Sequence, residues 1–475
     1  MTIIDIIKGL KNKHFSCYEL INFLLNKIKK NNTKLNCFIT IEYKNALKEA
    51  KQCDFLRKFN QNTCLHGIPI AYKDIFCTKG IKTTCGSKML KNFIPTYNSN
   101  IIEKLKHSGL INLGKTNMDE FAMGSFNENS FFGIVNNPWN LNLVSGGSSG
   151  GSASAISAGL IPASLGTDTG GSIRLPSSFC GITGLKTSYG FLSRYGIISY
   201  SSSLDQAGPM AHTVKDCAIL LNLISGYDPL DSTNINIKHD NYLKYINHSL
   251  KGKKIGLPIE YFKNINSQVS YIIQEAINVY TNLGISFFDI SLPYIESAMS
   301  AYYIIASAEA ASNLAKYDGI NYGYYKINPK SLEDLYITTR TKGFGKEVKN
   351  RILIGTYLLN NSKYFIKAKK IRKIIYNNFI NSFKKVDCIM IPTTKFIANQ
   401  INTKKNHFLN IQQDIYTISV NLAGLPAINI PIGFINKCPI GLQLITPHFT
   451  EKFLLNIAHC YQKNTNWHLN YPNLL

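Results

Sequence analysis

The sequence is short of the features that define several protein classes. None of its 475 residues falls in an apolar run approaching the roughly 18 residues that a membrane-spanning helix needs. The 11 cysteines are odd in number, scattered and without a C-x-x-C pair, which favours reduced thiols over a disulfide framework. The ten histidines show no metal-like spacing. Acidic Asp5 comes early and the N-terminus does not resemble a signal peptide, so we expect a cytoplasmic protein without a metal site.

Acidic residues and arginines are also scarce. The chain has 28 acidic against 52 basic residues, a net charge of +24, and only six of the basic residues are Arg. Such a charge favours nucleic-acid contact. However, Lys, Asn, Ile, Tyr and Phe all have A/T-rich codons, so composition drift explains the same charge, and we give drift the larger weight. The segment from Asp119 to Asp205 has three basic and five acidic residues, so the excess charge lies elsewhere.

The apolar content of 45% excludes a mainly disordered chain. Apolar spacing predicts two helices in the first thirty residues, the second opened by a capping box at 16–19, and a further helix over 44–57. Strand-like runs occur at 37–41, 67–74, 388–392, 427–431 and 440–445. Helical segments dominate 267–383, and the polar residues 228–250 suggest a surface connection. Alternating strands and helices predict an α/β layered fold around a central sheet.

The centre of the chain is rich in glycine and serine. Residues 145–153 read SGGSSGGSA, and residues 165–174 read LGTDTGGSIR. Both runs lie between strand-like and helical segments, unlike a flexible linker. Successive glycines let backbone N–H groups converge on an oxyanion, and a following serine such as Ser172 can attack a carbonyl. No histidine lies between His107 and His212, so a neutral lysine is the alternative base. Lys73, which ends an apolar strand, is the best candidate, although a lone lysine more often pairs with a neighbour such as Asp74.

One phosphate-binding pattern is rejected. Residues 109–116, GLINLGKT, match the P-loop motif G-x-x-x-x-G-K-T. A true P-loop wraps phosphate with the residues between its glycines, whereas Leu-Ile-Asn-Leu predicts a strand. We therefore assign no ATP site to this chain.

Together these segments resemble the amidase signature family. Its hallmark is GGSSGGS at 146–152 followed by GTDTGGSIR at 166–174, with the lysine of GIPIAYKD at 67–74. The resemblance implies a Ser–cis-Ser–Lys triad of Ser172, Ser148 and Lys73, with the backbone of Thr169, Gly170, Gly171 and Ser172 as oxyanion hole. It also implies an α/β/α sandwich around a central mixed sheet. We expect one domain over 1–475, with N-terminal helices over about 1–60 and a mainly helical insertion over about 267–383.

Further segments narrow the resemblance to the glutamine-hydrolysing chains of glutamyl-tRNA(Gln) amidotransferases. They are GKTNMDEFAMGS at 114–125, SLDQAGP at 203–209, NLAGLP at 421–426 and GLQ at 441–443. The resemblance implies a glutaminase that supplies ammonia, with no cofactor of its own. It implies a B subunit that uses ATP and Mg and binds most of the tRNA, and a small C subunit. Tyr302, Arg351 and Asp414 would bind glutamine, Arg351 at the α-carboxylate and Asp414 at the α-ammonium.

Two departures from the family pattern lie beside the site, Ser145 for a usual Pro and Thr187-Ser188 for Pro-Thr. Two other functions stay open at this point. A stand-alone amidase acting on small amides would use the same triad, but it should not need residues 114–125 as a partner-facing element. A non-catalytic scaffold or RNA-binding subunit is favoured by the net charge alone, and the joint presence of Lys73, Ser148 and Ser172 argues against it.

Overall fold

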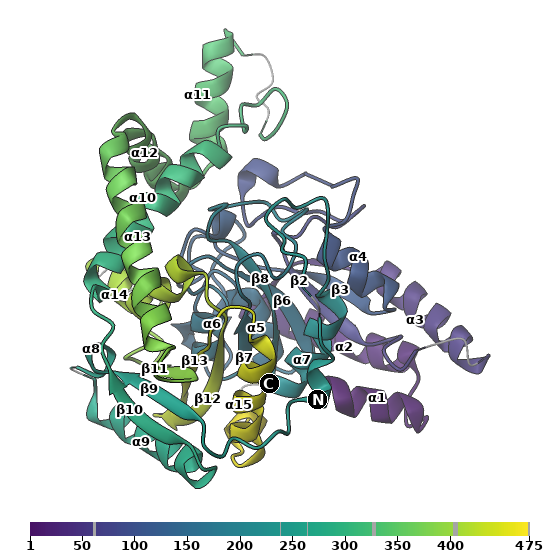
Figure 1. Cartoon of the computed structure of the whole chain (residues 1–475). Helices are drawn as coiled ribbons and strands as arrows, with labels where there is room; N and C mark the ends of the chain where they lie inside the picture. The colour runs from purple at the N-terminus through teal and green to yellow at the C-terminus, as the bar shows by residue number, and fades with distance from the viewer. Residues whose placement is uncertain (60–62, 238, 264, 325–328, 402–406, 474–475) are drawn as a thin grey trace.

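A computed structural model describes residues 1–473 except 60–62, 238, 264, 325–328 and 402–406. In this part of the chain eleven strands form one mixed sheet (Figure 1), in the order β1-β3-β2-β6-β8-β7-β12-β13-β11-β9-β10. The strands of the sheet are β1 Phe38–Ile41, β2 Pro69–Lys73, β3 Ile111–Thr116, β6 Ala163–Asp168, β7 Thr183–Lys186, β8 Gln206–Ala211, β9 Lys254–Pro258, β10 Ser286–Ile290, β11 Cys388–Pro392, β12 Ala427–Ile435 and β13 Cys438–Ile445. A separate hairpin pairs β4 Asn136–Asn137 with β5 Asn140–Val144.

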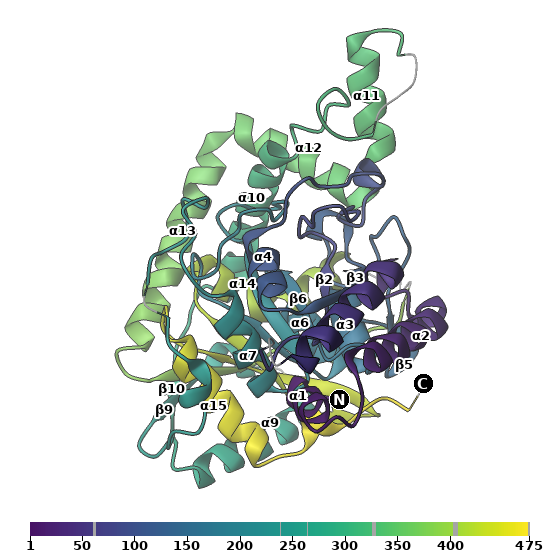
Figure 2. The same cartoon turned by 90° about the vertical axis from the view of Figure 1, so that its right-hand side faces the viewer.

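The helices lie on both sides of this sheet and beyond one of its ends (Figures 1 and 2). The helices are α1 Ile3–Lys11, α2 Cys17–Leu35, α3 Tyr43–Lys58, α4 Asn100–His107, α5 Gly150–Ser157, α6 Arg174–Cys180, α7 Val214–Ile224, α8 Ile259–Phe262, α9 Ser267–Asn282, α10 Ile295–Asn313, α11 Leu332–Gly343, α12 Lys346–Asn360, α13 Ser362–Ser382, α14 His407–Ala423 and α15 Glu451–Lys463. None of the described helices is long and apolar enough to cross a membrane.

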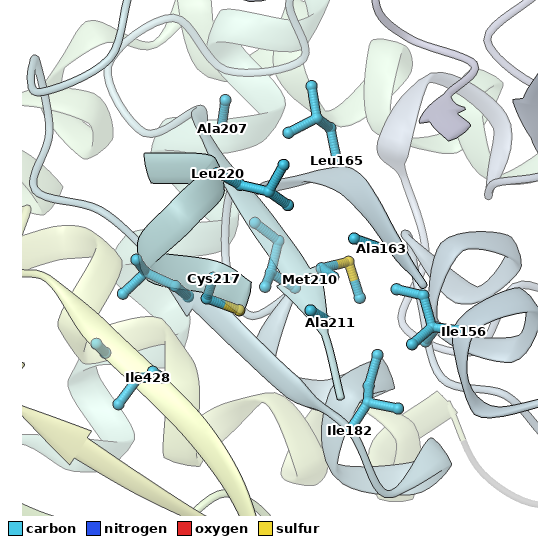
Figure 3. Packing of buried hydrophobic residues seen from close by; sticks show 14 of the residues in the cluster. Ile156, Ala163, Leu165, Ile182, Ala207, Met210, Ala211, Cys217, Leu220 and Ile428 are labelled. Atoms are coloured by element: carbon cyan, nitrogen blue, oxygen red, sulfur yellow. The ribbon is translucent and has the colours of Figure 1, made fainter. Parts of the chain in front are cut away.

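The centre of the sheet carries the core. Met210 and Ala211 of β8 are fully buried, with Ile156 of α5 and Cys217 of α7 beside them (Figure 3). Alternate residues of a strand point to opposite faces, so a strand with apolar residues throughout is covered on both. The two glycine-rich segments therefore begin helices that are packed into the core, and their loops have little freedom to move.

Most of the predicted elements are confirmed, including the capping box in which Ser16 and Glu19 bond each other's backbone at the start of α2. Two details differ. Strand β10, with the sequence SFFDI, lies inside the range expected to be helical, because it pairs in parallel with β9. The segment 228–250 is irregular, as expected, but it also buries Tyr242, Ile246 and Leu250, so it covers part of the core. The prediction of an α/β fold with a mixed sheet is confirmed: β2 and β6 are parallel neighbours, and β8 is antiparallel to β6.

Candidate active site

The three predicted catalytic residues come together at the carboxyl ends of the neighbouring strands β2 and β6. Lys73 is the last residue of β2, and β6 ends nearby because the two strands are parallel neighbours. Ser148 lies just before α5, and Ser172 lies between β6 and α6. Carboxyl ends of parallel strands and helix N-termini meet at such an edge, where open α/β sheets bind their ligands.

Lys73 is fully buried and contacts Ser148 directly. Its Nζ lies 2.7 Å from Ser148 Oγ and 2.9 Å from Thr167 Oγ1. Burial lowers the pKa of Lys73 from its ordinary 10.5 to about 7, against the opposing effect of the nearby carboxylates, Asp119 first among them. The alternative that Lys73 pairs with Asp74 is not what the structure contains. A lysine with this pKa is half neutral at pH 7 and can accept a proton.

The lysine of the rejected phosphate motif pairs with Asp74 instead. Lys115 Nζ lies 3.3 Å from Asp74 Oδ1, and both side chains are completely buried. Lys115 also donates to Phe76 O at 2.8 Å and to Thr83 Oγ1 at 2.9 Å. Its strand, β3, contains Leu-Gly-Lys-Thr as extended backbone. The predicted strand is thus confirmed. The charge of Lys115 is paired with Asp74 in the interior of the protein.

Two glycines allow the serine loops to approach each other and the base. The peptide between Gly147 and Ser148 is cis. A Cβ on Gly147 would lie 2.1 Å from Asp119 Oδ2, so a larger residue does not fit. Gly171 has φ +139°, which side chains rarely adopt. Ser149 N–H then donates to Ser172 O at 3.2 Å, which joins the loop before α5 to the loop before α6.

Ser172 is the one member of the three that reaches the surface of a pocket. It is 8% exposed, while Lys73 and Ser148 are inaccessible. In the described part of the chain no hydrogen bond joins the hydroxyls of Ser148 and Ser172. Catalytic hydrogen bonds are often long before substrate binds, so this gap does not exclude a proton relay.

One of the four N–H groups predicted to form the oxyanion hole already donates a hydrogen bond within the protein. Gly171 N–H donates to Asp168 Oδ1 at 2.8 Å, so it is committed to the loop. The N–H groups of Gly170 and Ser172 donate to no acceptor among the described residues, and both residues line the pocket. Thr169 Oγ1 bonds Asp205 Oδ1 at 2.6 Å. Thr169 does not line the pocket, so Gly170 and Ser172 are the two of the four predicted residues that combine a place on the pocket wall with an N–H group that has no acceptor among the described residues.

A buried ion pair holds the loop that carries Ser172. Arg174 Nη2 lies 2.9 Å from Asp168 Oδ1, and both side chains are inaccessible. Arg174 also bonds the side chains of Asn421 and Gln443. Burial raises the pKa of Asp168, but the charge of Arg174 outweighs it, and the pKa is lowered overall. The segments 421–426 and 441–443 noted in the sequence thus supply partners for the nucleophile loop.

A narrow pocket lies above Ser172. The three predicted substrate residues, Tyr302, Arg351 and Asp414, all line it. Tyr302 packs on the nucleophile loop, since a Cβ on Gly170 would lie 2.6 Å from its ring. Arg351, on α12, supplies a cation, and Asp414, on α14, supplies a carboxylate. A pocket with one group of each sign suits a zwitterionic substrate.

Further residues, which the sequence did not single out, hold the cation of the pocket. Arg351 Nε lies 2.8 Å from Glu347 Oε1, one helical turn away, and its Nη1 bonds Tyr200 OH. Its guanidinium lies 5.1 Å from the centre of the Tyr303 ring. The spacing of four residues between Glu347 and Arg351 was a usable signal. Nothing in the sequence placed Tyr200 beside Arg351.

The carboxylate of the pocket is held in a similar way. Ser125 Oγ donates to Asp414 Oδ2 at 2.8 Å, and Tyr303 OH donates to the same oxygen at 3.3 Å. Burial raises the pKa of Asp414 to about 6, against the opposing effects of the Ser125 bond and Arg351. Ser125 ends the segment 114–125, which the sequence had connected with partner contact. In the structure this segment reaches the pocket.

Asp119, in the same segment, lies between the loop that carries Ser148 and residues 124–129. Its carboxylate accepts N–H bonds from Asn127 at 2.9 Å and Asn129 at 3.1 Å. Burial raises its pKa to about 6. A Cβ on either Gly124 or Gly147 would meet this carboxylate within 2.5 Å. Asp119 therefore positions the backbone on two sides of the site. Among the carboxylates that raise the pKa of Lys73, Asp119 has the largest effect.

Known proteins resemble this chain over almost its whole length. The sequence model of the Amidase family matches residues 19–455. The glutamyl-tRNA(Gln) amidotransferase A subunit of Coxiella burnetii is 51% identical over 478 residues, covering 100% of this chain and 99% of that protein. The corresponding protein of Chromohalobacter salexigens is 50% identical over 475 residues, covering 99% and 98%. The crystal structure of the same protein from Thermotoga maritima matches with a TM-score of 0.83 at 36% identity, covering 100% and 98%. The chain belongs to the amidase signature family.

Proposed function

We propose that this chain is the glutamine-hydrolysing component of a glutamyl-tRNA(Gln) amidotransferase. The observation that carries the proposal is the buried contact of 2.7 Å between Lys73 Nζ and Ser148 Oγ, next to a pocket that presents Ser172 with Arg351 and Asp414. The contact supports serine chemistry with a lysine base. The two charges support an α-amino acid as substrate. The names of the relatives at about 50% identity supply the reaction as a whole.

Glutamine would bind with its α-carboxylate at Arg351 and its α-ammonium at Asp414. Arg351 is held by Glu347 and Tyr200, so its guanidinium needs little reorganisation on binding. Tyr302 walls the pocket beside Gly170 and directs the side-chain amide toward Ser172. Because Asp414 must be ionised to hold an ammonium group, binding should weaken as pH falls below about 6.

The acylation step would begin with two proton transfers. Neutral Lys73 takes the proton of Ser148, and Ser148 takes the proton of Ser172 as its oxygen bonds to the amide carbon of glutamine. The N–H groups of Gly170 and Ser172 stabilise the negative oxygen that forms. The carbon–nitrogen bond then breaks. The proton held on Lys73 returns through Ser148 to the leaving nitrogen, which departs as ammonia. Water cleaves the glutamyl ester and restores Ser172.

The ammonia would serve a second reaction outside this chain. We propose B and C subunits as partners, with the ATP-dependent step and most of the tRNA contact on the B subunit, and no cofactor on this chain. Since the product would enter protein synthesis, we place the complex in the cytoplasm. A stand-alone amidase would hydrolyse simple amides, whereas a site with Arg351 and Asp414 should discriminate strongly against amides that lack the two α-substituents.

The experiment is to isolate the chain with its co-purifying subunits and measure transamidation with glutamine or with ammonia. Ser172→Ala should lower glutamine-dependent product by at least about 10³-fold, as for other nucleophiles that act together with a base. Ammonia-dependent product should be unchanged. Ser178→Ala is the matched control, because this buried hydroxyl on α6 has no partner among the described residues. Glutamine-dependent activity of Ser172→Ala close to wild type would refute the nucleophile, and absence of partner subunits would favour a stand-alone amidase.

A further inference from the structure

The positive charge of the chain is concentrated in one segment. Residues 348–386 contain ten Lys and Arg residues and no Asp or Glu, so this segment of 39 residues carries +10 of the net +24. Most of it is helix α13, which has 21 residues and is therefore about 30 Å long. In both views α13 runs along the outer edge of the molecule (Figures 1 and 2). Composition drift alone would spread the charge over the surface.

Helix α13 has one buried face and one basic face. Ala368, Ile375 and Phe379 are buried at helical spacing. Lys363, Lys367 and Lys370 are exposed and follow one another at intervals of four and three residues, so they share one face of the helix. The basic face also carries exposed Lys373, with Lys369 at its margin, and exposed Lys384 and Lys385 follow just after the end of the helix.

These lysines have no carboxylate partners within the described residues. Three of them lie near aromatic rings instead: Lys363 lies 5.3 Å from the Tyr364 ring, Lys369 4.6 Å from the Phe365 ring, and Lys373 4.5 Å from the Tyr376 ring. Arg372, by contrast, faces inward and bonds Leu422 O at 2.8 Å. Arg372 therefore forms hydrogen bonds within the protein, whereas the lysines are exposed to solvent.

We propose that the basic face of α13 binds the phosphate backbone of RNA. Lysine ammonium groups act as point charges on phosphates and release counterions without reading sequence. Lys363 and Lys373 are about 15 Å apart along the helix axis, so one stretch of backbone can reach all the lysines between them. Exposed Tyr364, beside Lys363, offers a ring on which a base can stack.

Two other polyanionic partners fit the face less well. A helix that binds a membrane surface inserts its apolar face, but the apolar face of α13 is already packed inside the protein. Protein interfaces are depleted in lysine and have an apolar centre, whereas this face exposes Lys363, Lys367, Lys370 and Lys373, with only Ile366 and Ile374 as exposed aliphatic residues among them. The proposal goes beyond the glutaminase function, and it concerns a helix that contributes no residue to the pocket at Ser172.

The test compares two triple variants with the same loss of charge. Lys363/Lys367/Lys370→Gln removes three charges from α13. Lys29/Lys30/Lys34→Gln removes three exposed lysines from α2, which lies on the opposite side of the molecule from α13 in both views. Fluorescence anisotropy with labelled bulk tRNA is measured on each full-length protein over a range of KCl concentrations. Thermal unfolding checks that both variants remain folded.

We expect the α13 variant to bind tRNA about tenfold or more weakly near 0.1 M salt, and the slope of log K against log salt to become shallower by about two to three. The α2 variant should bind nearly as wild type. Equal losses in the two variants would overturn the proposal, because binding would then follow net charge alone. No tRNA binding by wild type would also overturn it. Both variants are in addition titrated with vesicles of phosphatidylcholine and phosphatidylserine, and weaker vesicle binding by the α13 variant with unchanged tRNA binding would likewise overturn the proposal. Glutamine hydrolysis should be the same in both variants, so this test is independent of the proposed catalysis.

Discussion

The burial of Lys73 predicts how glutamine hydrolysis depends on pH. A lysine with the ordinary pKa of 10.5 is neutral in about one molecule in 3,000 at pH 7, whereas Lys73, with a pKa of about 7, is neutral in about half. Only the neutral form can take the proton from Ser148. Activity should therefore rise with pH through about 7. The neutral fraction grows from about 0.1 at pH 6 to about 0.9 at pH 8, which predicts a nearly tenfold increase in acylation rate.

The assay is rapid-quench measurement of the first turnover of ammonia release at saturating glutamine. Saturation matters because Asp414, with a pKa of about 6, titrates nearby and affects binding. Under these conditions the midpoint of the rate against pH reports the base in the bound complex. With glutamine below saturation, the acidic limb should steepen below pH 6, where both groups take up protons.

Replacement of Lys73 by arginine tests whether the group is a base or a structural charge. The guanidinium stays protonated and cannot accept a proton, although it preserves the charge. We expect Lys73→Arg and Lys73→Ala to lose first-turnover rate alike, by at least about 10³-fold. A rate for Lys73→Arg close to wild type, or a wild-type rate that stays flat from pH 6 to pH 8, would refute the reasoning.

Three further predictions follow from the same site. Arg351→Ala should raise KM for glutamine by at least about tenfold with a smaller effect on kcat, because a carboxylate contact is made in ground and transition states alike; a collapse of kcat at constant KM would give Arg351 another role. Asp119→Asn should shift the acidic limb of the first-turnover rate to lower pH, because it removes the largest of the charges that raise the pKa of Lys73; an unmoved midpoint in a folded variant would contradict this. Asp168→Asn should lower the free energy of unfolding by about 3–5 kcal/mol in urea titrations, because it leaves Arg174 buried and unpaired; a loss below about 1 kcal/mol would contradict this.

The sequence predicted the strands and helices around the triad because their local patterns are strong. The capping box before α2, the apolar run that became β2 and the small-residue helix α5 each carry their own signal. Strand β10 was missed because a short run of five residues has no distinctive period. Its partner β9 comes about thirty residues earlier, and pairing over that distance cannot be deduced from local sequence.

The residues of the active site also fall into two groups, those that local sequence could predict and those that it could not. Lys73, Ser148 and Ser172 could be named because each lies in a motif with a chemical reason for its residues. The supporting residues could not, because their roles depend on distant contacts. Tyr200 reaches Arg351 across 151 positions, and Ser125 reaches Asp414 across 289. Such contacts exist only once the sheet and its helices have brought these segments together.

The low pKa of Lys73 needs explanation, because three buried carboxylates act to raise it. Two effects weaken their attraction for the proton of Lys73. The charge of Asp168 is balanced by Arg174 at 2.9 Å. Burial raises the pKa of Asp119 and also that of Asp205, so these two groups carry their full charge less readily than exposed carboxylates. The desolvation of Lys73 then outweighs the attraction that remains, and the amine stays available as a base. Loss of the Asp168 charge would leave Arg174 uncompensated nearby, which should lower the pKa of Lys73 further while it destabilises the fold.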